Sequence, residues 1–397
     1  MTDATATSRD TAALLPDDAA RALLVGRIWR ETPRPGPALI VVREGRIFDI
    51  STSVATMADL LDRDDPAHFV RGLEGEPLGP VETLLRNSLT EPQVAPFLLA
   101  PCDLQAIKAC GVTFAVSLLE RLIEERSGGD AVRANVLREE LTALVGADLA
   151  GIRPGSAPAL ALRETLRARG EWSQYLEVGI GPDAEVFTKA QPLASVGFGT
   201  RVGLHPDSSW NNPEPEIVLA VDAGGHVCGA TLGNDVNLRD MEGRSALLLG
   251  RAKDNNASCA MGPFIRLFDE HFDLDTLRRA RVALTVEGSD DGFRLEDASD
   301  MQLISRDPLE LVAQTFGAHH QYPDGFMLFL GTMFSPTLDR DGPGLGFTHH
   351  PGDRVSIATP SLGCLINRVD RTDRLPPWTF GLRQLFLHLK QGPPALS

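Results

Sequence analysis

Three acidic residues in one stretch of the chain have the types and spacing expected of metal ligands. Glu214 and Glu216 stand two residues apart at the start of an apolar run, Ile217–Val221, that predicts a β-strand. Side chains two apart on a strand leave the same face, so both carboxylates point to one place. A glycine turn and a second short strand then return Asp235 towards them. Three carboxylates suit a hard cation such as Mg²⁺ better than zinc.

An exposed, charged edge strand is the alternative explanation of the Glu214 and Glu216 pair, because charge on an edge prevents unwanted strand pairing. A second pair of charged residues also allows either a surface interpretation or a site interpretation. Glu185 and Lys189 share one face of a strand predicted over 184–189. They form either a surface ion pair, worth less than about 1 kcal/mol, or part of a site.

The elements around these residues follow from local patterns. Apolar residues from Phe114 to Ile123 form one stripe of a helix that ends at Ser127-Gly128-Gly129. A helix is also predicted from an Asn237 N-cap through Leu249, and it would carry Lys253 back towards Asp235. Over residues 20–50, strand, turn and hairpin signals alternate.

Several motifs together resemble the fumarylacetoacetate hydrolase family. The metal-site order is the clearest: Pro213-Glu-Pro-Glu216, an apolar strand, Gly233-Asn-Asp235, Arg239-Asp240, and Leu249-Gly-Arg-Ala-Lys253. Three further segments are similar to the family's opening strand, substrate-binding turn and closing strands: 107–115, Gly331-Thr332 and 352–367. The likeness covers roughly residues 100–385.

This resemblance implies an α+β fold, a mixed β-roll of the fumarylacetoacetate hydrolase type. We expect a small N-terminal α/β domain over 1–98 and a catalytic domain over 99–397, with a helical insertion at about 117–172. Asn234 and Arg239 join the candidates near the metal, although Arg239 also fits a helix surface. The implied roles are metal binding by Glu214, Glu216 and Asp235, catalysis by Glu185 and Lys253, and substrate binding by Lys189, Thr332, Asn234 and Arg239.

Within the family, the segments 172–178, 182–189 and 210–216 are most similar to the sugar-acid branch. That likeness implies Mg²⁺-dependent dehydration of a 2-keto-3-deoxypentonate, such as 2-keto-3-deoxy-D-xylonate, to 2,5-dioxopentanoate, with Mn²⁺ as an alternative ion. Hydrolytic relatives carry a His-x-x-Glu pair where this chain has Ser117 and Glu120. The missing histidine weakens the hypothesis that the protein is a hydrolase, because activation of a water molecule needs a base. Glu120 is then either that glutamate or a surface residue.

Two other functions stay open. One is hydrolysis of an acylpyruvate C–C bond, or decarboxylation of a 2-keto acid, on the same metal. The other is a non-enzymatic scaffold that binds small acids. His319-His320 and His349-His350 lack the partners of a zinc site and are interpreted as loop residues. The glycines at 197, 199 and 203 lack nucleotide-loop spacing and are interpreted as turns.

Composition limits the partners. The 38 basic and 54 acidic residues give a formal charge of −16, which argues against nucleic acid and anionic membranes. The five cysteines contain no C-x-x-C motif and predict reduced, mostly buried thiols in a cytoplasmic protein. The N-terminus has no signal-peptide pattern. The resemblance adds a homodimer or homotetramer.

Overall fold

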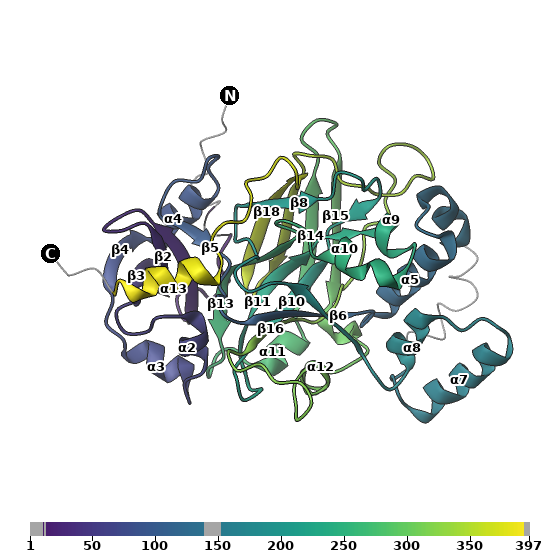
Figure 1. The fold of residues 1–397 in the computed structure, drawn as a ribbon, viewed down its shortest axis with the longest axis horizontal. Coiled ribbons are helices and arrows are strands. Elements are labelled where there is room, and N and C mark those ends of the chain that lie inside the picture. The colour runs from purple at the N-terminus through teal and green to yellow at the C-terminus, as the bar shows by residue number, and fades with distance from the viewer. Residues whose placement is uncertain (1–10, 12, 139–151, 393–397) are drawn as a thin grey trace.

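The structure is a computed structural model that describes residues 11, 13–138 and 152–392. Its centre is an 11-stranded mixed sheet in which β16 and β6 run parallel and the other described strand pairs are antiparallel (Figure 1). The order is β4 (Glu76–Pro80), β3 (Arg46–Asp49), β2 (Gly36–Arg43), β1 (Leu24–Arg30), β13 (Cys259–Leu267), β11 (Val227–Asp235), β10 (Pro215–Val221), β16 (Phe326–Phe329), β6 (Ala106–Gly111) and β7 (Glu185–Ala190), and β5 (Phe97–Leu99) pairs with β1.

A second sheet packs on the first. Strand β10 contacts β14, β11 contacts β17, and β13 contacts β18. The main hydrophobic core lies between the two sheets. Every residue of β10 is buried, as expected of a strand covered on both faces. The second sheet has the order β15 (Arg294–Asp300), β14 (Arg281–Glu287), β17 (Arg354–Thr359), β18 (Gly363–Arg371) and β8 (Arg201–Leu204), and a separate pair joins β12 (Asn237–Leu238) to β9 (Asn211–Asn212).

The helices gather mainly at two ends of the molecule (Figure 1). One end holds α2 (Met57–Leu61), α3 (Pro66–Gly72), α4 (Val81–Ser88) and α13 (Leu382–Lys390). The other end holds α5 (Ala115–Ser127), α7 (Ala157–Ala168) and α8 (Gln174–Ile180). The remaining helices are α9 (Arg239–Glu242), α10 (Leu249–Lys253), α11 (Leu274–Arg278) and α12 (Pro308–Thr315), with 3₁₀ turns at Ala246–Leu248 and Met301–Leu303.

Most local predictions are confirmed. The first three strands form the predicted hairpin arrangement. Helix α5 ends at Gly128, whose φ of 67° is the left-handed conformation that glycine adopts easily at a helix C-cap. All five cysteines are free thiols, and four of them are buried. His349 and His350 lie in a loop, as predicted.

The single helix predicted from Asn237 is wrong. Residues 237–238 instead pair with 211–212 as strands β12 and β9, and the chain then forms α9, a 3₁₀ turn and α10. Helix α9 begins after Leu238 without a side-chain cap. Asn237 is fully buried rather than placed at an exposed helix start. Pairing with a distant strand therefore overrides the local capping signal.

The N-terminal segment shares its sheet with the rest of the chain, because β1 pairs directly with β13. The predicted boundary near residue 98 falls inside β5, which pairs with β1. The division into two domains stays a prediction. In the predicted insertion, the described residues belong to α5, a helix over 131–138 and α7, and α8 follows the insertion.

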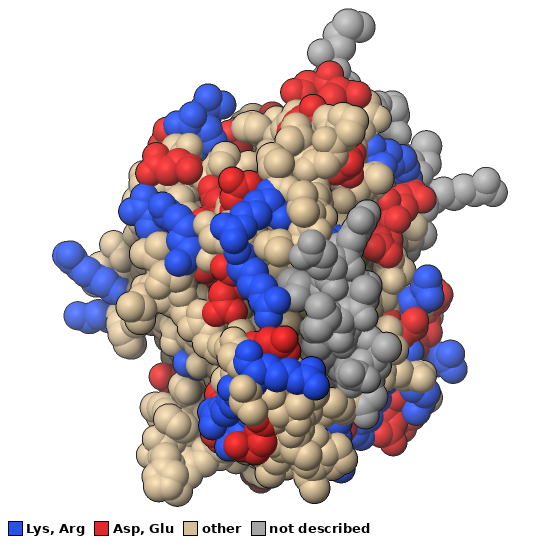
Figure 2. All heavy atoms as spheres, turned by 90° about the vertical axis from the view of Figure 1, so that its right-hand side faces the viewer, with Lys and Arg blue, Asp and Glu red and all other residues tan. Residues whose placement is uncertain are grey.

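The surface is consistent with the charge pattern of the sequence. Figure 2 shows lysine, arginine and acidic side chains interspersed over the face of the molecule that carries α7 and α8. Among the described residues, none of the helices has the length and apolar character needed to span a bilayer.

Candidate functional site

The three predicted metal ligands meet in the interior. Glu214 and Glu216 flank Pro215 at the start of β10, and Asp235 ends the neighbouring strand β11. The Asp235 amide donates to the Glu214 carbonyl at 3.1 Å, which places the two strand ends side by side. One carboxylate oxygen from each of the three residues lies within 4.8 Å of the others, and all three side chains are buried. The three carboxylates therefore lie close together, as the strand spacing predicted.

The electrostatics of this triad favour a bound cation. Burial raises the pKa of Glu216 well above its usual value, and the nearby Asp235 and Glu214 raise it further. For Glu214, burial also opposes ionisation, but Lys253 and Arg121 outweigh it and lower its pKa to about 2. Glu216 accepts hydrogen bonds from the Gly331 amide at 2.7 Å and the Thr332 hydroxyl at 3.4 Å. Thr332 therefore orients a predicted metal ligand.

Two lysines surround the triad. The Lys253 ammonium, from α10, donates to Glu214 at 2.5 Å and to Asp235 at 3.2 Å. Lys189, from β7, contacts the other Asp235 oxygen at 2.8 Å. Burial would lower the pKa of Lys253, but Asp235 and Glu214 more than compensate and raise it. In this arrangement Lys253 is a proton-carrying cation.

Glu185 approaches the same place from strand β7. It pairs with Gly111 of β6, and a Cβ atom on Gly111 would lie only 1.9 Å from the Glu185 carboxylate. Glycine at 111 therefore makes room for this side chain. Glu185 is half-buried, and burial raises its pKa despite the opposing charges of Arg121 and Lys253. A carboxylate with a raised pKa is suited to proton transfer near neutral pH.

A buried network of ion pairs around Arg121 was not predicted. Arg121, on α5, donates to Glu214 and lies 2.5 Å from Glu124 and 3.0 Å from Glu242. Arg239 in turn contacts Glu124, at 2.6 Å. The sequence does contain a signal for this network, the i, i+3 pair of Arg121 and Glu124 beside the apolar stripe of α5. An analysis of the apolar positions alone does not detect that pair.

Glu120 is not the surface residue that one reading of the sequence allowed. It is buried, and its carboxylate contacts Arg239 at 2.6 Å and Arg138 at 2.7 Å. Burial acts against ionisation, but these arginines lower its pKa. Ser117 caps α5 by accepting from the Phe114 amide and donating to its carbonyl. The position that carries the water-activating pair in hydrolases therefore holds a helix cap and a neutralised carboxylate.

The remaining candidates lie near the triad in different roles. Asn234 accepts from the Glu214 amide at 3.1 Å, and its own Nδ2 is buried without a partner among the described residues. Arg239 is buried, and its guanidinium contacts Glu120, Glu124 and the carbonyl of Pro336. Substrate binding by Asn234, Lys189, Thr332 and Arg239 stays a prediction.

The charges of this site, which we call the charged cluster, leave an excess of two negative charges. The cluster has seven carboxyl groups and five cationic side chains among the described residues. A buried excess of this size is unfavourable unless protons or a cation balance it. A triad of three carboxylates offers only oxygen ligands and fits a divalent cation such as Mg²⁺. The members are Glu120, Glu124, Glu185, Glu214, Glu216, Asp235 and Glu242, with Arg121, Arg138, Lys189, Arg239 and Lys253.

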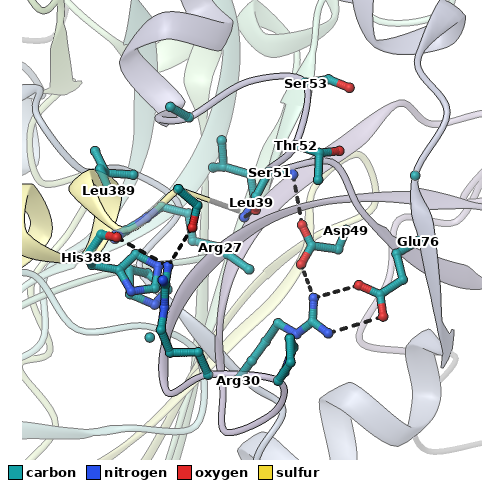
Figure 3. Close-up of a pocket in the computed structure, with 18 of the residues that line it drawn as sticks. Arg27, Arg30, Leu39, Asp49, Ser51, Thr52, Ser53, Glu76, His388 and Leu389 are labelled. Atoms are coloured by element: carbon teal, nitrogen blue, oxygen red, sulfur yellow. Dashed lines mark hydrogen bonds and ion pairs between the residues drawn. The ribbon is translucent and has the colours of Figure 1, made fainter. Parts of the chain in front are cut away.

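A cavity of about 920 Å³ lies elsewhere, between the N-terminal strands and α13 (Figure 3). We call it the α13 groove; its lining includes Arg30, Asp49, Glu76 and His388. None of the charged-cluster residues lines it. The α13 groove and the buried charged cluster therefore lie in different parts of the molecule.

One region of the chain matches a known protein family. Residues 212–370 match the family model for the fumarylacetoacetate (FAA) hydrolase C-terminal domain, so the chain contains a domain of that family. The resemblance seen in the sequence is therefore confirmed. The probable 2-keto-3-deoxyxylonate dehydratase of Haloferax volcanii is 31% identical over 195 residues, 49% of this chain and 63% of that protein. The 2-dehydro-3-deoxy-D-arabinonate dehydratase of Saccharolobus solfataricus is 30% identical over 198 residues, 48% and 60% of the two chains. This chain thus aligns with less than two thirds of either relative.

Solved structures confirm the α+β fold class. The apo form of 2-keto-3-deoxy-D-arabinonate dehydratase has a TM-score of 0.61 at 19% identity, over 88% of this chain and 99% of the other. The complex of that enzyme with magnesium and 2,5-dioxopentanoate has a TM-score of 0.60 at the same identity and coverage. A fumarylacetoacetate hydrolase from Exiguobacterium antarcticum has a TM-score of 0.53 at 16% identity, over 88% and 100% of the two chains.

Proposed function

We propose that this protein is a Mg²⁺-dependent dehydratase that converts a 2-keto-3-deoxypentonate, such as 2-keto-3-deoxy-D-xylonate, to 2,5-dioxopentanoate in oxidative pentose degradation. The observation that carries the proposal is the buried convergence of Glu214, Glu216 and Asp235 beside Glu185 and Lys253. The names of the two curated relatives support the same reaction class.

The triad would hold the ion, and the ion would polarise the 2-keto group of the substrate as a Lewis acid. Asn234 and Thr332 would keep Glu214 and Glu216 in place through the hydrogen bonds described above. Lys189 would hold Asp235 in the same way.

Proton transfer would use Glu185 and Lys253. The raised pKa of Glu185 suits a base that takes a proton from C3. Lys253 carries a proton and contacts two triad residues, so it, or a bound water, would donate a proton to the C4 hydroxyl, which leaves as water. Glu185 and Lys253 each combine a shifted pKa with a place beside the triad, and this supports an enzyme rather than a passive scaffold.

The alternative is hydrolysis of an acylpyruvate or decarboxylation of a 2-keto acid on the same metal. The structure offers little support for hydrolysis, because Ser117 caps a helix and Glu120 is paired with arginines. A water nucleophile would need another base.

The test is incubation of the purified protein with 2-keto-3-deoxypentonate and Mg²⁺, with parallel incubations with an acylpyruvate and with oxaloacetate. We expect 2,5-dioxopentanoate from the first, and loss of its formation after chelation of the metal. Release of pyruvate from the acylpyruvate, without dehydration of the sugar acid, would replace the dehydratase by a hydrolase. Binding of all three acids without turnover would leave a scaffold.

The cellular setting is also a proposal. A charge of −16 supports a small anionic substrate bound through a cation rather than nucleic acid or a membrane surface. We propose a cytoplasmic homodimer or homotetramer, which subcellular fractionation and sedimentation analysis would check.

A further inference from the structure

The strand pair that carries the triad continues past it, because β9 and β12 keep the register of β10 and β11. Glu214 stands opposite Asp235, whose amide donates to the Glu214 carbonyl. Two residues further along each strand, Asn212 stands opposite Asn237. Residues two apart on a strand share a face, so this pair of asparagines lies on the face of the triad. It follows the two predicted metal ligands at a distance of about 7 Å.

Both asparagines are fully buried, and most of their polar atoms are unpaired. The Asn212 Oδ1, the Asn237 Oδ1 and the Asn237 Nδ2 have no hydrogen-bond partner among the described residues. The Asn212 Nδ2 donates to the Pro213 carbonyl at 2.9 Å, which fixes the orientation of that amide. The Cβ atoms of directly opposed residues lie about 5 Å apart. Two acceptors and one donor are thus grouped beside the triad, and buried groups of this kind are nearly always hydrogen-bonded.

The face of the triad is polar on the side of the asparagines and apolar on the other side. On the apolar side, a Cβ atom on Gly233 would lie 2.3 Å from Phe329 and 2.5 Å from Val218, which belong to a hydrophobic core. Beyond the asparagines, the Arg239 guanidinium lies 4.4 Å from the centroid of the Trp210 ring. A polar chain that leaves the triad along this face therefore meets the asparagines before it meets that stacked pair.

An uncharged hydroxyl group is the ligand that fits the two amides. A hydroxyl donates to an amide oxygen and accepts from an amide nitrogen, so it can bond to both side chains at once. In the proposed reaction the C4 hydroxyl of the substrate leaves as water, whereas the C5 hydroxyl stays on the carbon chain during that step. The C5 hydroxyl is also at the far end of the substrate from the carboxylate and keto group that would bind the ion.

We propose that Asn212 and Asn237 are specificity-determining residues that bind the C5 hydroxyl of the substrate. The inference rests on the proposed dehydratase function and narrows its substrates to 2-keto acids with a hydroxyl group at C5. A site built to bond a substrate hydroxyl strongly rejects analogues that lack it, because its own buried groups are then left unpaired. A buried water molecule is the alternative occupant of the pair, and the experiment distinguishes it from the substrate.

The experiment compares two acids of the same C4 configuration that differ at C5 alone. One is 2-keto-3-deoxypentonate, and the other is 4-hydroxy-2-oxopentanoate, which ends in a methyl group. Both carry a C3 proton and a C4 hydroxyl, so both can lose water through the same metal and the same proton-transfer groups. Asn237→Leu replaces the amide by an apolar side chain of similar size. The matched control is Asn87→Leu on α4, which removes an amide that bonds to the Pro96 carbonyl outside the charged cluster.

We expect the parent to prefer the pentonate about tenfold in kcat/KM, the effect of one hydrogen bond. Asn237→Leu should lower kcat/KM for the pentonate about tenfold and leave that for the methyl analogue within about twofold of the parent. Asn87→Leu should keep the preference of the parent.

The contrary outcomes are distinct. Equal losses with both acids would mean that Asn237 supports the site as a whole, and no loss with the pentonate would mean that water fills the pair; either result overturns the inference. A parent that dehydrates both acids equally well would overturn the inference alone. A parent that dehydrates neither acid would overturn the proposed function, and the inference with it.

Two further measurements cover the case in which Asn237→Leu does not fold. Asn212→Leu removes the other unpaired amide oxygen and should also reduce the preference for the pentonate. The parent itself can be titrated in a calorimeter, with Mg²⁺, with the 3,3-difluoro derivatives of the two acids, which have no C3 proton to lose. We expect the derivative with the C5 hydroxyl to bind about tenfold more tightly. Equal affinities would refute the inference.

Discussion

Two regions of this molecule concentrate charge, and they differ in how that charge is balanced. In the α13 groove, Arg30 lies between Asp49 and Glu76 and pairs with both, as Figure 3 shows. Glu76 is half exposed, so water shares in its solvation. In the charged cluster, the triad residues are at most 1% exposed, and the seven carboxyl groups of the cluster outnumber its five cationic side chains.

This difference indicates that buried carboxyl groups with shifted pKa values, rather than cavity volume, mark the candidate site. The groove is spacious, but its charges are paired and partly solvated, which is an ordinary surface arrangement. The cluster lies outside that groove, but burial and like charges shift the pKa values of Glu185, Glu216 and Glu242 upwards. Strongly perturbed carboxyl groups around a common point are the better indicator of a reaction centre.

We expect the largest effect from a substitution in the carboxylate triad. Glu216→Gln removes one of three charges while keeping the side-chain shape. We expect dehydration to fall by about 10³-fold or more, since each tenfold corresponds to about 1.4 kcal/mol of transition-state stabilisation. Calorimetric titration with Mn²⁺ should show weakened binding in parallel. A Glu216→Gln protein with the activity and metal affinity of the parent would remove the triad from the mechanism.

The next effect concerns the ion pairs behind the triad. Arg121→Met leaves Glu124, Glu214 and Glu242 without their shared partner. Removing one side of a buried pair typically costs about 3–5 kcal/mol of unfolding free energy. Urea denaturation of the metal-free protein measures this. A loss below about 1 kcal/mol would mean that Arg121 behaves like a surface residue, and the contrast with the groove would disappear.

The stability of the protein should depend on pH through Glu242 of the charged cluster. Burial raises the pKa of Glu242 to about 7, whereas a glutamate in an unfolded chain titrates near about 4.3. The folded protein therefore binds a proton that the unfolded chain has lost, and this contribution to stability disappears as the pH rises from about 4.3 to about 7.

Glu242→Gln tests that sign, because glutamine resembles the protonated acid. Metal-free parent and variant should have similar stability near pH 4, and the variant should become more stable above pH 7, by on the order of 3 kcal/mol. Melting temperatures recorded in a chelator across this range give the measurement. Curves that stay parallel would show that Glu242 ionises normally.

The smallest effect belongs to the groove. Glu76→Gln removes one partner of Arg30 but leaves the pairing with Asp49. We expect a change below about 1 kcal/mol in unfolding free energy, reduced further by salt, and unchanged dehydration. A marked loss of activity would mean that the groove takes part in the reaction, and the comparison would need to be reversed.

Local periodicity was enough to predict the parts of the site that depend on neighbours in the chain. Glu214 and Glu216 are two apart on a strand, and the hairpin geometry of β10 and β11 returns Asp235 to them. The same reasoning failed at Asn237, where pairing with residues 211–212 replaced a helix start. Backbone hydrogen bonds to a distant strand are invisible to a local pattern.

The strand spacing of the triad and the order of the family motifs could therefore be predicted without any structure. Only the tertiary structure decided that Arg121 reaches Glu214, 93 residues away, and that Glu120 is buried between arginines. The physical reason is that burial and long-range ion pairing, which set the pKa of a carboxyl group, depend on every element packed around it.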